Sequence, residues 1–144
     1  MVIESPSLLI TDDDSAFRET LQGVFEPQGY RTILAEDGEE AIRIVRTQVV
    51  HLALLDMHMP KLTGLETLRL VKQFKAMLPC IILSADLDEM IVEQARREHA
   101  YSVLRKPVTL MQIIRVVRQA LESTYNWQAY RPKIHPLMMH METR

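Results

Sequence analysis

The sequence holds very little cysteine and no long apolar run. Its single cysteine, Cys80, cannot form an internal disulfide, and its place in the apolar run at residues 80–83 predicts a buried structural thiol. The first residues lack the basic segment and apolar core of a signal peptide. No apolar run approaches the ~20 residues that span a bilayer. We therefore expect a cytoplasmic protein with no membrane as a partner.

A large excess of charge of either sign is also lacking. The 144 residues include 17 Lys and Arg against 19 Asp and Glu, a formal net charge of −2, which gives no reason to expect direct binding of nucleic acid. Hydrophobic residues make up 47% of the chain and charged residues 25%, as in ordinary globular proteins. A chain of this length can bury one substantial core, so we expect one folded domain.

Strand-like and helix-like segments alternate along the chain. Such alternation is typical of an α/β protein, in which helices cover both faces of a parallel sheet. The apolar runs predict five strands, at residues 7–11, 30–34, 52–56, 79–84 and 100–104. The third run is continuously apolar until its last residue, as expected for a strand that is buried on both faces.

Five helices are predicted from helical spacing and from capping residues. The first is expected to end near Pro27 and Gly29, and the third to occupy residues 64–77. Asp37, Asp86 and Thr109 are placed to cap the second, fourth and fifth helices. The side chains expected to face inward are Phe17, Leu21, Val24, Phe25, Ala41, Ile44, Val45, Leu65, Leu68, Val71, Phe74, Ile91, Val92, Ala95, Leu110, Ile113, Ile114, Val117 and Leu121.

Polar side chains follow these strands at the points where the strands end. Asp12 and Asp13 close the first strand, and Asp56 closes the third. Ser84 ends the fourth strand, and Lys106 follows the fifth. Because ligands of an open parallel sheet bind beyond the carboxyl ends of its strands, these groups should lie at one edge. The pattern predicts a site for a divalent metal and a phosphoryl group.

The next acid, Asp14, has two readings. It could be a third metal ligand, or it could cap the first helix. A metal that also binds a phosphate needs only two acids from this segment, so we assign Asp14 to capping.

Four separated pieces of the sequence match a known pattern in order and in spacing: Asp12-Asp13, Asp56-Met57-His58-Met59-Pro60 with Gly64, Ser84-Ala85, and Lys106-Pro107. On these residues the chain resembles the receiver domain of bacterial response regulators, the phosphoacceptor half of two-component signalling. The resemblance covers residues 7 to about 122. It implies a flavodoxin-like, doubly wound, five-stranded parallel sheet in the order 2-1-3-4-5 with five helices. Residues 1–122 would form the receiver domain, and residues 123–144, where the helical periodicity fails, a tail or the start of a linker.

The resemblance also implies how the edge of the sheet would bind a metal. Asp13 would bind Mg²⁺ directly and Asp12 through water, because Mg²⁺ prefers oxygen ligands and keeps several waters. Asp56 and the backbone carbonyl of His58 would complete the protein ligands. The alternative is that the His58 side chain itself binds the metal or is phosphorylated, and we favour the use of its backbone carbonyl alone.

The phosphoacceptor would be Asp56, which would form an aspartyl phosphate. Lys106 would place its ammonium on a phosphoryl oxygen and, with the metal, keep Asp56 ionised although neighbouring carboxylates raise its pKa. Ser84 would move its hydroxyl to another phosphoryl oxygen and pull its loop inward. A cis peptide between Lys106 and Pro107 is implied as well.

The implied function is a Mg²⁺-dependent switch and not an enzyme with turnover. A sensor histidine kinase, a phosphotransfer protein or a small acyl phosphate would supply the phosphoryl group, and slow self-hydrolysis would remove it. A downstream protein would read the surface formed by the fourth helix, the fifth strand and the fifth helix.

Four alternatives are open. The chain could be a degenerate receiver that binds without phosphorylation, or the receiver of a larger effector protein. An aspartate-nucleophile phosphatase would need a second acid two residues after Asp56, where His58 stands. A flavin protein of this architecture would need a phosphate-cradling loop after the first strand, where three aspartates stand instead.

The sequence departs from the family in two places and ends in an unusual segment. Val103 stands where the family usually has an aromatic switch residue, and His99 replaces a usual glycine. Tyr101 could substitute for the aromatic, or the signal could pass through the backbone at residues 84–88. Trp127 and Tyr130 could fold back or dock on a partner. The Met/His-rich end, with His135, Met138, Met139, His140 and Met141, is expected to be a disordered tail and not a soft-metal site.

Overall fold

The computed structural model describes residues 3–86 and 88–128, and within them the predicted α/β fold is confirmed. Five parallel strands form one sheet in the order β2-β1-β3-β4-β5, as the resemblance implied. The strands are β1 (Ser7–Thr11), β2 (Arg31–Ala35), β3 (Leu52–Asp56), β4 (Cys80–Ser84) and β5 (Ser102–Arg105).

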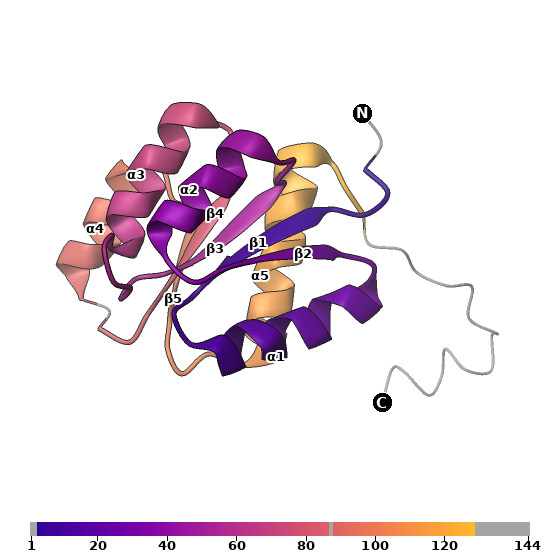
Figure 1. The fold of residues 1–144 in the computed structure, drawn as a ribbon, viewed down its shortest axis with the longest axis horizontal. Coiled ribbons are helices and arrows are strands. Elements are labelled where there is room, and N and C mark those ends of the chain that lie inside the picture. The colour runs from indigo at the N-terminus through magenta and orange to yellow at the C-terminus, as the bar shows by residue number, and fades with distance from the viewer. Residues whose placement is uncertain (1–2, 87, 129–144) are drawn as a thin grey trace.

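Five α-helices cover the two faces of the sheet in the described ranges (Figure 1). They are α1 (Ser15–Phe25), α2 (Gly38–Thr47), α3 (Gly64–Phe74), α4 (Glu89–Arg97) and α5 (Leu110–Tyr125), and a short 3₁₀ helix η1 (Glu26–Gln28) follows α1. Helices α1 and α5 pack on one face, and α2, α3 and α4 on the other. None of the described helices has the length and apolar character needed to cross a membrane.

The alternation of side chains along the strands creates two core layers. In β1, Leu8 and Ile10 pack against α1 and α5, whereas Leu9 packs against the opposite layer. Cys80 is fully buried in that second layer, and burial raises the pKa of its thiol to about 12. The prediction of an inert structural thiol is therefore confirmed.

Gly64 fixes the loop that follows β3. A Cβ at this position would lie 2.6 Å from the backbone oxygen of Asp56, so any side chain would push the loop away from the strand. Its N–H donates to the Met57 carbonyl at 2.9 Å. The glycine thus lets α3 begin directly against the end of β3.

Two predictions about helix ends were wrong. Asp88, and not Asp86, caps α4, since its Oδ1 accepts a hydrogen bond from Ile91 N at 2.8 Å. Helix α3 ends at Phe74, because the chain must turn before β4. Phe74 is 46% exposed, Val92 is 42% exposed and Leu110 is 39% exposed, so none of these three faces inward as predicted. Arg46 instead covers the Phe74 ring, with its guanidinium carbon 4.8 Å from the ring centroid.

Other boundaries differ by one to three residues. Strands β2 and β4 each begin one residue later than predicted, and β5 begins at Ser102 because residues before it finish α4. His99 adopts a left-handed conformation (φ 63°) and Ala100 N donates to Ala95 O, which closes that helix end. Helix α5 continues to Tyr125, three residues beyond the expected loss of periodicity. The domain boundary after residue 122 stays a prediction.

Candidate functional site

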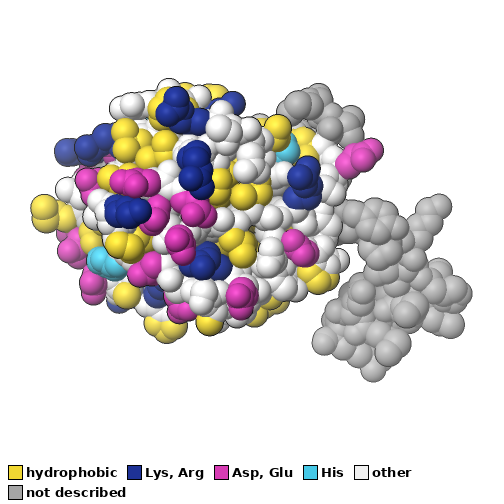
Figure 2. Space-filling model, in the orientation of Figure 1, with side chains coloured by type: hydrophobic (Ala, Val, Ile, Leu, Met, Phe, Trp, Pro, Cys, Tyr) yellow, Lys and Arg dark blue, Asp and Glu magenta, His cyan; other side chains and the backbone are white. Residues whose placement is uncertain are grey.

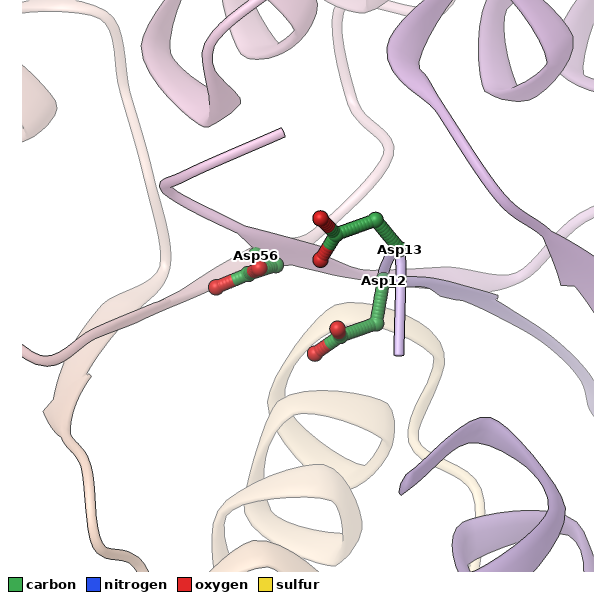
Figure 3. A group of neighbouring side chains, drawn as sticks. All are labelled: Asp12, Asp13 and Asp56. Atoms are coloured by element: carbon green, nitrogen blue, oxygen red, sulfur yellow. The ribbon is translucent and has the colours of Figure 1, made fainter. Parts of the chain in front are cut away.

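The carboxyl edge of the sheet brings together the three acids singled out from the sequence. Asp12 and Asp13 directly follow β1, and Asp56 is the last residue of the neighbouring strand β3. One carboxylate oxygen from each lies within 4.8 Å of the others, and Figure 3 shows the three side chains directed toward a common space. Asp12 and Asp56 are buried, whereas Asp13 is exposed. The cluster is therefore accessible from one side.

Lys106 completes the cluster from the loop between β5 and α5. Its Nζ lies 3.0 Å from Asp12 Oδ2 and 3.1 Å from Asp56 Oδ1, so one ammonium bridges both buried carboxylates. The Lys106 backbone N–H donates to Ser84 O at 2.9 Å, which ties this loop to the end of β4. The peptide between Lys106 and Pro107 is cis, as the resemblance implied.

The charges of the cluster act on one another. Burial raises the pKa of Asp56, and Asp12 and Asp13 raise it further, while Lys106 opposes them only in part. For Lys106, burial lowers the pKa, but the hydrogen bonds to Asp12 and Asp56 outweigh burial and raise it. Lys106 therefore stays protonated. Its single positive charge does not offset the neighbouring carboxylates and the burial of Asp56, and a bound cation would add the positive charge that is needed.

Ser84 has an unsatisfied side chain at this edge. The residue is fully buried, and its Oγ has no hydrogen-bond partner among the described residues. Leaving a buried hydroxyl without a partner costs about 1–3 kcal/mol. An oxygen atom brought in by a ligand would remove that cost. The free hydroxyl therefore fits the role expected from the sequence.

The donor set fits a small hard cation. Carboxylate oxygens are the ligands that Mg²⁺ prefers, and Mg²⁺ needs few of them because it retains water. Both carboxylate oxygens of Asp12 already accept hydrogen bonds, from Asp14 N at 2.9 Å and from Lys106 Nζ. This arrangement suits a ligand that reaches the ion through water, whereas the exposed carboxylate of Asp13 suits direct binding.

The His58 side chain takes no part in the acid cluster. Its Nε2 lies 3.3 Å from Asp86 Oδ2, across the loops that follow β3 and β4. Both side chains are exposed. This pairing was not predicted, because Asp86 had been assigned to helix capping. Binding of a metal by the His58 carbonyl stays a prediction.

Two residues of α1 reach the site and were missed as site residues. The ring centroid of Phe17 lies 4.8 Å from Lys106 Nζ, and Arg18 Nη1 donates to the backbone oxygen of Asp12 at 2.5 Å. Asp14 caps α1 as predicted, with its Oδ1 accepting from Ala16 N and Phe17 N. Helical spacing had placed Phe17 in the core, and nothing local in the sequence links it to a lysine so far along the chain.

The two departures from the family pattern have structural consequences. The side chain of Val103, which has no aromatic ring, packs against the core layer of α2, α3 and α4. Tyr101 precedes β5, donates its N–H to Cys80 O, and lies 40% exposed. Cys80 begins β4, and Ser84 ends it. Tyr101 therefore lies beside the start of β4, whereas Ser84 lies at its end. The suggestion that Tyr101 replaces the aromatic switch residue was wrong.

Trp127 folds back onto the domain. Its ring centroid lies 5.4 Å from that of Tyr30, and it packs against the core layer of α1 and α5. Of the two possibilities for Trp127, folding back onto the domain or docking on a partner, the structure shows the first. Tyr130 and the Met/His-rich segment that includes His135 and His140 lie outside the described residues.

Comparisons with known proteins agree with this arrangement. Residues 8–118 match the family model of the response regulator receiver domain. The chain is 30% identical over 119 residues to response regulator RR06 of Streptococcus pneumoniae, a match that covers 83% of this chain and 54% of RR06. Against the transcriptional regulatory protein ZraR of Klebsiella oxytoca, the identity is 31% over 84% of this chain and 27% of the relative. The chain thus spans about half or less of the length of these relatives.

A solved structure of the same fold is a CheY-like response regulator receiver domain protein from Methanospirillum hungatei. It has a TM-score of 0.82 and 20% identity, over 85% of this chain and 98% of that one. A chain of the CheX–CheY–BeF₃–Mg²⁺ complex from Borrelia burgdorferi has a TM-score of 0.76 and 26% identity, over 81% of this chain and 89% of that one.

Proposed function

The chain belongs to the family of response regulator receiver domains, and on that premise we propose that Asp56 is its phosphoacceptor. The observation that carries the proposal is convergence around this one carboxylate. Asp12 and Asp13 lie beside it, Lys106 Nζ is 3.1 Å from its Oδ1, and the buried Ser84 hydroxyl at the same edge has no partner among the described residues. An oxygen of a bound phosphoryl group would give the Ser84 hydroxyl a partner.

Mg²⁺ is the cofactor that we propose for this site, held by Asp12, Asp13, Asp56 and the His58 carbonyl. When bound, it supplies positive charge to the carboxylates and to the phosphoryl group. The Borrelia CheX–CheY–BeF₃–Mg²⁺ complex, one chain of which shares the fold of this protein, supports this assignment. So does the raised pKa of Asp56, because a site crowded with acids gains most from an added cation.

The protein's own residues would carry out the transfer. A carboxylate oxygen of Asp56 forms a bond to phosphorus while the bond from phosphorus to the donor atom breaks. Lys106 stays charged and shifts its ammonium from Asp56 toward a phosphoryl oxygen. Ser84 donates its hydroxyl to a second phosphoryl oxygen and thereby draws in the loop at residues 84–88. That movement is the switch, since Val103 provides no aromatic toggle.

Receiver domains of this family interact with histidine kinases and with downstream effectors, and they are not classical enzymes. We propose a sensor histidine kinase or a phosphotransfer protein as donor, a downstream protein as reader, and a cytoplasmic location. On the face shown in Figure 2, acidic and basic side chains are interspersed and do not separate into regions of one sign. The described residues of this face therefore form no basic patch of the kind that binds nucleic acid.

The alternatives are not favoured. A degenerate receiver would not be expected to keep three acids, Lys106 and Ser84 in one place. For an aspartate-nucleophile phosphatase, His58 would have to supply the missing acid, but its side chain pairs with Asp86 instead. A flavin phosphate would be repelled by Asp12 and Asp13 at the end of β1. We expect no turnover of an added phosphate monoester.

Phosphorylation by a small donor tests the proposal. The wild type, incubated with Mg²⁺ and acetyl phosphate, should gain the mass of one phosphoryl group in intact mass spectrometry, and Asp56→Asn should gain none. Asp14→Asn is a matched control, because it makes the same change in an acid outside the cluster and asparagine caps helices equally well. It should be labelled like the wild type. An unlabelled wild type, or a labelled Asp56→Asn, would refute the assignment.

A further inference from the structure

Lys106 has a third neighbour besides its two carboxylates. The face of the Phe17 ring lies against its ammonium, 4.8 Å from Nζ to the ring centroid. Resting on the proposed function, we propose that Phe17 is a positioning residue for phosphoryl transfer, whose ring holds the Lys106 ammonium beside Asp56. An aromatic face attracts a cation through its negative electrostatic potential, and an aliphatic side chain of similar size does not.

The position of Phe17 is tightly determined. Its backbone N–H donates to Asp14 Oδ1 at 3.3 Å as part of the α1 cap, and the next residue, Arg18, donates to the backbone oxygen of Asp12. The ring is half-buried and packs against the core layer of α1 and α5. The first turn of α1 is therefore anchored to the end of β1, and the ring stays in place when the charges of the site change.

The fixed position of the Phe17 ring matters because the other partners of Lys106 change during the reaction. Before transfer, the ammonium is shared between Asp12 Oδ2 and Asp56 Oδ1. Once Asp56 carries a phosphoryl group, the oxygen that is bonded to phosphorus no longer bears a full negative charge. Asp12 would then compete with the phosphoryl oxygens for the ammonium. The ring is neutral, so its attraction for Lys106 is the same before and after transfer and favours one location for Nζ.

The size of the effect can be bounded. Cation–π contacts at partly buried sites change free energies by amounts that correspond to roughly threefold to tenfold in a rate constant. We expect this loss in the maximal rate of phosphorylation, at saturating donor, and not in the affinity for Mg²⁺. The ring acts on the ammonium and supplies no ligand to the ion, so metal binding should stay within about twofold of the wild type.

The experiment compares ring-free and ring-bearing variants. Phe17→Leu and Phe17→Met keep an apolar side chain without a ring face, whereas Phe17→Tyr keeps the face. Phosphorylation by acetyl phosphate is followed by mass spectrometry as a function of donor concentration. The two ring-free variants should lose roughly threefold to tenfold in maximal rate, and Phe17→Tyr should retain the wild-type rate. Two ring-free variants are used so that a packing defect in one of them, seen as a lowered melting temperature, does not decide the result.

A double-mutant cycle then shows whether the ring acts through Lys106. In a Lys106→Met background, followed over long incubations, Phe17→Leu should change the slow residual rate by less than about twofold. Phe74→Leu is the matched control elsewhere. Its ring lies under Arg46 at the same 4.8 Å but far from the acid cluster, so the rate should not change.

Each possible result has a defined meaning. An unlabelled wild type refutes the proposed phosphoacceptor and leaves Phe17 without a reaction to support. If the wild type is labelled, three results overturn the role of Phe17 alone: an unchanged rate in the ring-free variants, an equal loss in Phe17→Tyr, or an equal loss in the Lys106→Met background.

Discussion

The two edges of the sheet differ in how their polar groups are satisfied. At the carboxyl edge, Asp12, Asp13 and Asp56 crowd around one ammonium, and the Ser84 hydroxyl has no partner among the described residues. At the amino edge, His51 Nδ1 accepts from Ser7 N at 2.9 Å, and Tyr125 donates its hydroxyl to His51 O at 2.8 Å. The contacts at the carboxyl edge are between charged groups and leave the Ser84 hydroxyl unpaired within the described ranges, whereas the contacts made by His51 at the amino edge are between neutral, paired groups.

The amino edge joins the first and last parts of the fold. The rings of His51 and Tyr125 meet edge to face, with centroids 5.6 Å apart at 90°, so the end of α5 is held beside the start of β3. Burial lowers the pKa of His51, which keeps the ring neutral and able to accept from Ser7. These contacts stabilise the fold, whereas the mutual repulsion of the crowded acids at the other edge reduces its stability.

Mg²⁺ binding at the carboxyl edge should produce the largest change in the free energy of unfolding. Because binding to the folded state alone stabilises it, Mg²⁺ at roughly 100 times Kd should raise the free energy of unfolding by about 2.7 kcal/mol. Asp13→Asn should lose most of this gain, and without Mg²⁺ it should be at least as stable as the wild type, since one of the crowded charges is gone. Urea denaturation with and without Mg²⁺ measures both. Equal stabilisation of the wild type and Asp13→Asn would contradict the assigned ligand.

A smaller change is expected from the amino edge. Tyr125→Phe removes the hydroxyl that donates to His51 O and should lower the free energy of unfolding by about 1 kcal/mol. Tyr101→Phe is the control, because its exposed hydroxyl only approaches Ser123 Oγ at 3.5 Å, and its loss should cost about 0.5 kcal/mol or less. Neither variant should alter phosphorylation. A slower phosphorylation in Tyr125→Phe would mean that the two edges are coupled.

The smallest effect concerns pH. The pKa of His51 is lowered from 6.5 in the folded protein, so the neutral ring favours folding and a proton favours unfolding. Its contribution to stability is therefore complete above about pH 6.5 and is lost as the pH falls from there through the lowered pKa. His51→Asn keeps an acceptor for Ser7 N but cannot titrate. The difference in stability between the variant and the wild type should be constant above pH 7 and shift in favour of the variant toward pH 5. A pH-independent difference would show that His51 titrates as in the unfolded chain.

Strand positions were predicted best where the core determined them. Strands β1 and β3 were predicted to the residue, because each is an apolar run buried on both faces and cut short by aspartate. The start of β5 was missed, because His99 and Ala100 complete the end of α4 through a backbone conformation that the side chains do not reveal. Asp86 and Asp88 both suit a cap, and only the path of the loop selects Asp88.

The sequence predicted that the candidate site residues lie together, but it did not predict the side chains around them. The acids, Ser84 and Lys106 stand at strand ends, and parallel strands bring their ends together, so topology alone places them at one edge. Phe17 and the pair of His58 with Asp86 were missed, since each joins segments whose approach depends on how a helix or loop packs.

The order and spacing of apolar runs and polar strand ends determined, without any coordinates, the class of fold and the edge on which chemistry is possible. The reason is that burial of apolar strands and the direction of parallel chains leave few alternatives. The tertiary structure decided which groups are paired and which are left unsatisfied: the ammonium between two carboxylates, the ring beside it and the buried hydroxyl without a partner. Those properties depend on distances of a few ångströms between residues remote in the chain, and such distances are set by packing.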